Sequence, residues 1–187
     1  MKGLLTYISI LTSIIVVLVI MGTRGNGEQE AKYELPTNEE QFISAINLAY
    51  RQSQSANDLQ KENIKSLRDS AICEAIKHKQ EISDWYGTIA DISSTSSNNA
   101  TLAIKLPNGT ILKTWNNSLS DIGDHTIIDK KSDVYKDVYD LSIGDSIIFS
   151  GSFIKDGKQC AQETSITTNG SLNAPAFLFR FSSITKS

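Results

Sequence analysis

The sequence predicts an α+β protein with an N-terminal membrane helix, a long amphipathic helix or helix pair, and a small β-barrel of five to six strands with one short helix. Three observations support this prediction: an uncharged apolar segment, a stretch of apolar residues at helical spacing, and a series of short alternating segments. They divide the chain into an anchor or signal segment (1–24), a tether (25–36), a helical segment (37–80) and a barrel domain (81–187).

The first segment is apolar enough to enter a membrane. Residues 3–23 carry no charge, and these 21 residues match the roughly 20 that a helix needs to cross the hydrocarbon layer. Lys2 favours an N-terminus inside the cell, so we expect the rest of the chain outside the cytosol, in the periplasm if the source is bacterial. The length favours a retained anchor. The alternative is a signal segment cleaved near Gly22 or Gly25, which leads to secretion.

The charge balance disfavours nucleic acid as a partner. The chain has 18 basic and 21 acidic residues; without residues 1–24, which hold two basic residues and no acid, 16 remain against 21, a net charge of −5. Proteins that bind nucleic acid derive much of their affinity from basic groups that neutralise phosphates. An acidic domain without a basic stripe lacks this source of affinity.

The two cysteines, Cys73 and Cys160, lie in the part of the chain that is predicted to be exported. An even number of cysteines in an oxidising compartment indicates a disulfide. The bridge would close a loop with a sequence separation of 87 residues (160 minus 73) and constrain the unfolded chain by about 4 kcal/mol. The alternatives are two separate buried thiols or a redox-active thiol, for which the usual C-x-x-C motif is missing.

The helical segment begins with a start signal. Residues 37–40 follow Pro36 and have the form of a capping box. The segment forms one long helix or two, with a break near residues 53–57, where polar residues cluster. It either packs on the domain as an amphipathic helix or serves as a stalk or partner helix. The apolar positions at helical spacing are Phe42, Ile46, Ala49, Ala56, Leu59, Ile64, Leu67, Ala71 and Ala75.

After residue 81 the apolar residues recur with a period of two, which is typical of strands. A tight turn is predicted at 107–109 and a polar loop at 116–131. Ser132 and Asp133 then begin a short helix, with Val134, Val138 and Leu141 on one face. The predicted strands are 85–92, 100–106, 110–115, 146–154, 159–167 and 176–184, the last with three phenylalanines on one face.

Three strands, a short helix and further strands follow one another in the order of an OB-fold barrel. Residues 85–184 resemble bacterial cell-envelope OB-fold proteins of unassigned function. The resemblance rests on residues 85–89, on 144–151, where Gly144 and Asp145 lead into an apolar strand, and on 175–181. It implies a binding module and names no ligand.

The candidate binding residues lie on the predicted strands. Trp85, Tyr86 and Trp115 could stack on bases or sugars, and Lys105 and Lys113 flank the same hairpin. The alternative is that the aromatic residues fill the barrel and the lysines belong to an ordinary solvated edge.

Neither a metal site nor a catalytic site is expected. The group Asp121, Asp124, His125 and Asp129 has suitable ligands but is interpreted as a solvated polar loop. The other histidine is His78, and the sequence contains neither G-x-S-x-G nor H-E-x-x-H. We therefore expect no enzyme and no cofactor.

The expectation for function is a non-enzymatic envelope protein, held by a membrane helix at residues 3–23 or exported. It would present a disulfide-braced OB-like domain to a protein or glycan partner. Two alternatives are a domain that binds single-stranded nucleic acid and an exported hydrolase. The ligand, the biological process and the oligomeric state stay open.

Overall fold

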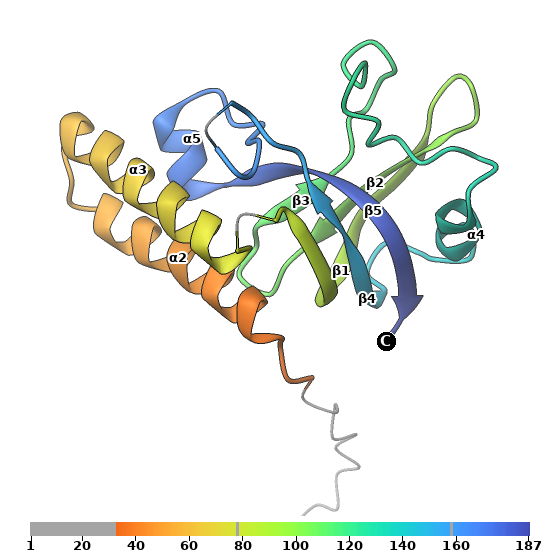
Figure 1. Cartoon of the computed structure of the whole chain (residues 1–187), viewed down its shortest axis with the longest axis horizontal. Coiled ribbons are helices and arrows are strands. Elements are labelled where there is room, and N and C mark those ends of the chain that lie inside the picture. Colours follow the sequence, from red (N-terminus) through yellow and green to blue (C-terminus); the bar gives the residue numbers. More distant parts are fainter. Residues whose placement is uncertain (1–32, 78, 158) are drawn as a thin grey trace, which may run out of the picture. The chain divides into compact units, whose positions relative to one another are not determined.

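The computed structural model describes residues 33–187 apart from 78 and 158, and within them it contains five strands and four helices (Figure 1). The mixed α+β class is confirmed. In chain order the elements are α2 (Thr37–Ser53), α3 (Asp58–Ala75), β1 (Glu81–Ser94), β2 (Ala100–Lys105), β3 (Ile111–Lys113), α4 (Asp133–Tyr139), β4 (Ser146–Phe153), α5 (Thr168–Asn173) and β5 (Ala176–Lys186).

The strands form a closed barrel in the order β1-β2-β3-β5-β4, in which β4 returns to β1. All neighbouring pairs are antiparallel except β3 and β5, which run parallel. β1 is long enough to pair with both β2 and β4 and is bent by irregularities on either side of Gly87. A Cβ atom at Gly87 would lie 2.4 Å from the Ile104 side chain, so the close approach of β1 and β2 requires glycine here.

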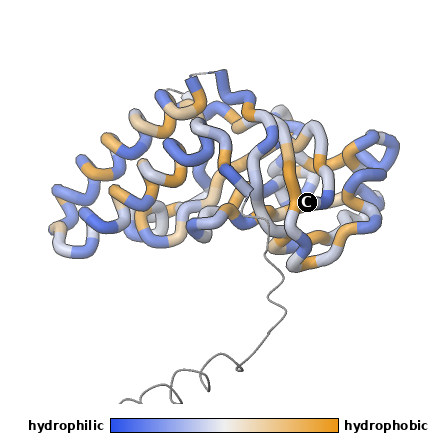
Figure 2. The backbone as a smooth tube through the Cα atoms, turned by 90° about the horizontal axis from the view of Figure 1, so that it is seen from below, coloured by the Kyte–Doolittle hydropathy of each residue, from blue (hydrophilic) through white to orange (hydrophobic). Residues whose placement is uncertain are grey.

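The barrel interior is filled by alternating apolar residues of its strands. Figure 2 colours the backbone by hydropathy and shows hydrophobic stretches both in the barrel and in the helices. Phe177, Phe179 and Phe181 of β5 are all buried, as the sequence predicts. Phe149 and Phe153 of β4 contact them edge-on, a preferred geometry for aromatic pairs. These rings form the centre of one continuous core.

The helical segment is a pair of helices that packs at one end of the barrel (Figure 1). The break lies at residues 54–57, as the polar cluster predicts. The capping box is not where we predicted it: α2 begins after Pro36 without a side-chain cap, whereas Asn57 and Gln60 form a complete capping box at the start of α3. Phe42 of α2 packs against Trp85, so the pair is attached to the barrel.

The predicted apolar face of the helical segment is correct for α2 and wrong for part of α3. Phe42, Ile46 and Ala49 are buried, but Leu59 and Leu67 have exposed fractions of 84% and 60%. Because the chain turns between Ser53 and Asp58, α3 does not continue the buried face of α2. The buried side of α3 consists of Arg68, Ile72, Cys73 and Ala75.

The predicted strand at 159–167 does not form, so the barrel has five strands. This segment makes only isolated bridges, among them Glu163 with Phe177, and it leads into α5. The described residues therefore contain two short helices after the barrel begins, α4 and α5, instead of one. α5 packs on α2 and α3, whereas α4 packs on β5.

A disulfide and a buried ion cluster fasten α3 to the segment between β4 and β5. Cys73 and Cys160 are bonded, with Cα atoms 5.3 Å apart, so the predicted bridge is confirmed. The Arg68 guanidinium lies 2.8 Å from Glu163 and 2.7 Å from Asp69, and it donates a 2.6 Å hydrogen bond to the Ser171 carbonyl. Buried charges that are paired in this way favour one arrangement of the two segments.

The predicted membrane segment (3–23), the signal alternative and most of the tether lie outside the described residues, as does His78. Across the part that the structure describes, no helix is both long and apolar enough for a membrane crossing. Tyr33–Ser187 forms one compact unit, so the helix pair and the barrel belong together.

Candidate binding surface on strands β2 and β3

The outer surface of β1, β2 and β3 contains a hollow of about 310 Å³. Asp91 pairs with Ala103, and Ala103 pairs with Lys113, so these three side chains form one row across three strands. Directly opposed residues in antiparallel pairs point to the same side of the sheet. The small Ala103 side chain therefore leaves space between a carboxylate and an ammonium group.

The walls of the hollow come from segments that are distant in the sequence. Thr164 belongs to the segment after β4 and is held there by hydrogen bonds from its backbone N–H (2.8 Å) and its hydroxyl (3.2 Å) to the Ala176 carbonyl. The residues that line the hollow are Asp91, Thr101, Leu102, Ala103, Lys113, Thr114, Trp115, Asn116 and Thr164.

The indole of Trp115 is held in place by the loop that follows β3. Its Nε1–H donates a 2.8 Å hydrogen bond to the Asp124 carboxylate, and its backbone N–H donates to the Thr126 hydroxyl at 2.8 Å. Asp121 stabilises the same loop by accepting hydrogen bonds from the backbone N–H groups of Thr126 and Ile127. A ring with a fixed orientation loses little freedom when a ligand stacks on it.

These bonds also show what the acidic loop residues do. Asp121 and Asp124 are hydrogen-bonded to their own loop, and the backbone carbonyl of His125 accepts from Arg180. Over the described residues, no group of three or more His, Cys, Asp or Glu side chains is arranged to hold a metal ion.

The structure brings two of the five predicted binding residues, Lys113 and Trp115, into the hollow. Lys105 is exposed near the end of β2, where it pairs with Ile111, and it does not line the hollow. Trp85 points the other way, into the barrel.

Trp85 and Tyr86 support the junction between the barrel and the helix pair. The Trp85 side chain is fully buried, and its Nε1–H donates a 3.1 Å hydrogen bond to Asn38, so its faces are not accessible for stacking. The half-buried Tyr86 ring stacks on Tyr33, with 5.1 Å between ring centroids, and its hydroxyl is 3.0 Å from that of Ser146.

Sequence reasoning missed Asp91, Ala103, Asn116 and Thr164. The alternation of β2 places Ala103 on the outer face, so the pattern contained a signal for this residue. Asp91 has the parity of the buried residues Trp85 and Ile89 and faces outward only because of the irregularity between Ile89 and Asp91. The position of Thr164 depends on a segment that we predicted to be a strand.

A second hollow, of about 340 Å³, lies beside the disulfide and the ion cluster. Its charged groups are already paired: Lys65 lies 2.7 Å from Asp69, and Asp69 also binds Arg68. This arrangement fastens two segments together, so the hollow on β2 and β3 is the stronger candidate for a ligand.

The fold and the hollow define a small α+β barrel protein with a mixed-charge recess on one outer face. We found no match to this chain among protein-family models, curated proteins or solved structures.

Proposed function

We propose that the chain is a non-enzymatic envelope protein whose barrel is OB-like and binds a partner without covalent chemistry. The strand order β1-β2-β3-β5-β4, with α4 between β3 and β4, supports the OB-like assignment. OB-fold barrels bind their ligands over strands 2 and 3 and the adjacent loops. The hollow occupies that face.

The observation that supports a glycan or protein partner is the row Asp91–Ala103–Lys113 with Trp115 beside it. A carboxylate accepts hydrogen bonds, an ammonium donates them, and an indole offers a flat apolar face. Sugar rings combine hydroxyl groups with apolar faces, so this set suits a glycan best. A peptide segment is the second choice, because its backbone also needs both donors and acceptors.

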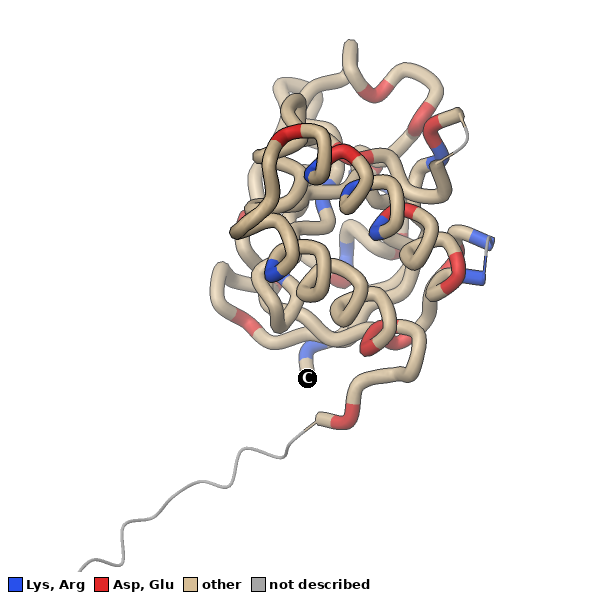
Figure 3. Tube along the Cα trace, turned by 90° about the vertical axis from the view of Figure 1, so that its left-hand side faces the viewer, with Lys and Arg blue, Asp and Glu red and all other residues tan. Residues whose placement is uncertain are grey.

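Single-stranded nucleic acid is less well matched to this surface. Residues 33–187 carry 15 basic and 19 acidic residues (18 minus Lys2, Arg24 and Lys32; 21 minus Glu28 and Glu30), a net charge of −4. Figure 3 shows the two signs interspersed without a continuous basic stripe. The one lysine of the hollow shares its row with Asp91, which would repel a phosphate.

The compartment is part of the proposal. Disulfides persist in oxidising compartments, so the bond between Cys73 and Cys160 favours a domain outside the cytosol. The uncharged residues 3–23 would bring the domain to that compartment, either as a membrane anchor or as a cleaved signal.

The test compares two lysines of the same hairpin. Soluble glycan fragments from the cell envelope, and a single-stranded oligonucleotide as the alternative, are titrated against the protein by calorimetry. Lys113→Ala should weaken glycan binding about tenfold, as truncation of a central contact does, whereas Lys105→Ala should leave it nearly unchanged. Ala103→Leu should also weaken binding, because the larger side chain fills the hollow.

Equal losses for the two lysine variants would count against the site. Salt-dependent binding of the oligonucleotide, without glycan binding, would instead support the nucleic-acid alternative.

A further inference from the structure

The α2–α3 pair exposes an uncharged surface where a solvated one is expected. The exposed face of a helix in a globular protein usually carries charged residues. On α3, Leu59 and Leu67 have exposed fractions of 84% and 60%, and on α2, Leu48 has an exposed fraction of 49%. None of these side chains belongs to the barrel core.

Charged residues of α3 are concentrated on one side of the helix. Asp58, Lys61, Glu62, Lys65 and Asp69 follow a spacing of three to four residues, which places them on a common face. This face interacts with the rest of the protein: Glu62 accepts a hydrogen bond from Thr168 of α5, and Lys65 belongs to the ion cluster. The remaining face of α3 has no charge before Glu74.

The uncharged residues also recur with the spacing of helix-packing seams. On α2 they are Gln41, Ala45, Leu48 and Gln52, and on α3 they are Gln60, Asn63 and Leu67, whereas Ser55 and Ala56 lie in the connection between the helices. Alternate steps of four and three residues place a stripe along one side of a helix, as at the contact positions of helical bundles. Both helices therefore carry such a stripe, in addition to the face that each buries.

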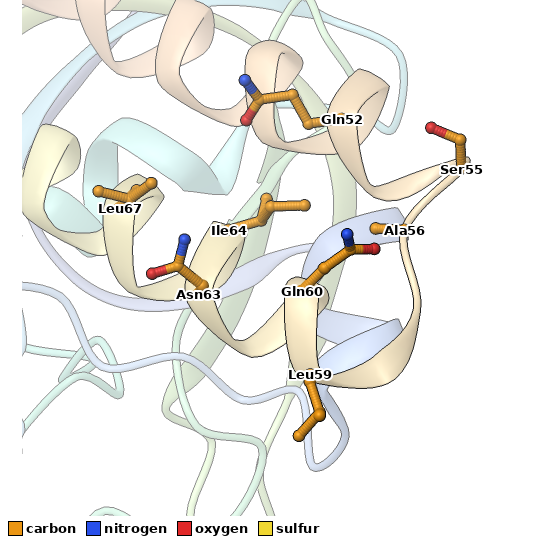
Figure 4. A pocket seen from close by; sticks show the side chains of 8 residues that line it. All are labelled: Gln52, Ser55, Ala56, Leu59, Gln60, Asn63, Ile64 and Leu67. Atoms are coloured by element: carbon orange, nitrogen blue, oxygen red, sulfur yellow. The ribbon is translucent and has the colours of Figure 1, made fainter.

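The end of the α2 stripe and the first part of the α3 stripe border a groove of about 550 Å³ where the two helices meet (Figure 4). Eight side chains line it and none is charged: Gln52, Ser55, Ala56, Leu59, Gln60, Asn63, Ile64 and Leu67. In Figure 4, Leu59 projects outward from the first turn of α3, whereas Ile64 lies between the helices. The same surface thus has a protruding apolar side chain next to an uncharged hollow.

We propose that two copies of the chain associate through this groove and form a four-helix bundle. A twofold contact places one surface against itself, so each protrusion must find a hollow on the same surface of the partner. Leu59 and the groove meet this requirement. The contact also brings like residues together, which would repel if they were charged, whereas Gln and Asn amides both donate and accept hydrogen bonds.

The position of the groove leaves it accessible to a second copy. It lies beside residues 54–57, where α2 and α3 meet, and the described chain begins at Tyr33 near the other end of α2 (Figure 1). The 17 residues of α2 separate these ends by about 25 Å. Because the groove does not involve the hollow on β2 and β3, this proposal is independent of the proposed function.

The test measures the molar mass of the full-length chain in mild detergent by light scattering across a range of protein concentrations. We expect the mass of two chains for the natural sequence. Leu59→Glu and Leu67→Glu should each weaken association at least tenfold, because burial of like charges at a twofold contact is unfavourable. Leu119→Glu is the matched control, since Leu119 is 81% exposed outside the helix pair, and it should associate normally.

A charge-swap experiment distinguishes a direct contact from an indirect effect. Leu67→Lys and Leu67→Glu chains should each be single chains alone and should pair when mixed. A natural chain of single mass, Glu variants that still associate, or charge variants that do not pair would each overturn the proposal. Association that persists in the Glu variants would place the contact elsewhere, for example in residues 1–32. A single chain that sediments with lipid vesicles through Leu59 would instead identify a lipid-binding surface.

Discussion

Protonation of the buried residue Glu39 should set the pH dependence of stability. Its side chain is fully buried at the first turn of α2. One carboxylate oxygen accepts a 2.9 Å hydrogen bond from the backbone N–H of Tyr86, and the other has no hydrogen-bond partner among the described residues. Burial raises the pKa of Glu39 from 4.5 to about 7; the hydrogen bond from Tyr86 lowers it and the nearby Glu40 raises it.

This shift determines the direction of the effect. Below about pH 4.5 the carboxyl group is protonated in both the folded and the unfolded chain, so it causes no pH dependence there. Between 4.5 and about 7 the unfolded chain ionises first, so the free energy of unfolding decreases as the pH rises. A shift of this size corresponds to at most about 3 kcal/mol, all of it lost above the folded pKa.

The substitution Glu39→Gln removes the titration and keeps the shape of the side chain. Its amide leaves one buried group unpaired, which costs about 1–3 kcal/mol at every pH. That constant cost cancels when the variant and the natural chain are compared at two pH values. We therefore expect the stability of the variant relative to the natural chain to increase by as much as about 3 kcal/mol from pH 4.5 to pH 8.

The measurement is urea unfolding of the full-length chain at constant ionic strength, followed by the fluorescence of its two tryptophans, of which Trp85 is fully buried. Glu34→Gln is the control: Glu34 is an exposed carboxylate that precedes α2 and does not shift the pKa of Glu39, so this variant should keep the slope of the natural chain. Parallel pH profiles for the natural chain and Glu39→Gln would refute the assignment of the slope to Glu39.

Three further substitutions test how the domain is held together, each by its urea midpoint. Replacing Cys73 and Cys160 by serine should cost about 4 kcal/mol, and reduction of the natural chain should reproduce that loss; two unequal losses would argue against the bridge as the cause. Gly151→Ala should cost at least about 2 kcal/mol, because the new Cβ would lie 2.1 Å from a carbonyl of β5; near-native stability would contradict this close approach. Arg68→Met should cost about 3–5 kcal/mol, because the buried Glu163 loses its nearest charge partner and keeps only Lys65 at 4.0 Å. Adding Glu163→Gln should recover part of this loss; a loss that the second substitution leaves unchanged would contradict the assignment to the ion pair.

The barrel was predictable because its signal is local. Leu102, Ile104 and Leu112 alternate with outward residues, and each strand contains enough of this pattern to be recognised alone. The helix break was predictable for the same reason. The start of α2 at Thr37 was predictable as well, but its cap was not, because Thr37 is already the first helical residue and no side chain caps this end.

The errors fall where distant contacts decide the conformation. The segment 159–167 alternates like a strand, but Cys160 is bonded to Cys73 and Glu163 binds Arg68, so it follows α3 rather than a sheet. The same limitation applies to the candidate site. Lys113 and Trp115 were identifiable as residues at the end of a strand, whereas Thr164 reaches the hollow only through this rearranged segment.

β5 completes the barrel because it pairs with β3 on one side and β4 on the other. Until residues 176–186 are in place, both of those strands present unpaired backbone groups to the surroundings. An emerging chain that stops before this segment therefore has two open sheet edges that can recruit strands from other chains. β5 covers the open edges of β3 and β4 at the same time. Deletions within β5 should therefore cause aggregation in addition to a loss of stability.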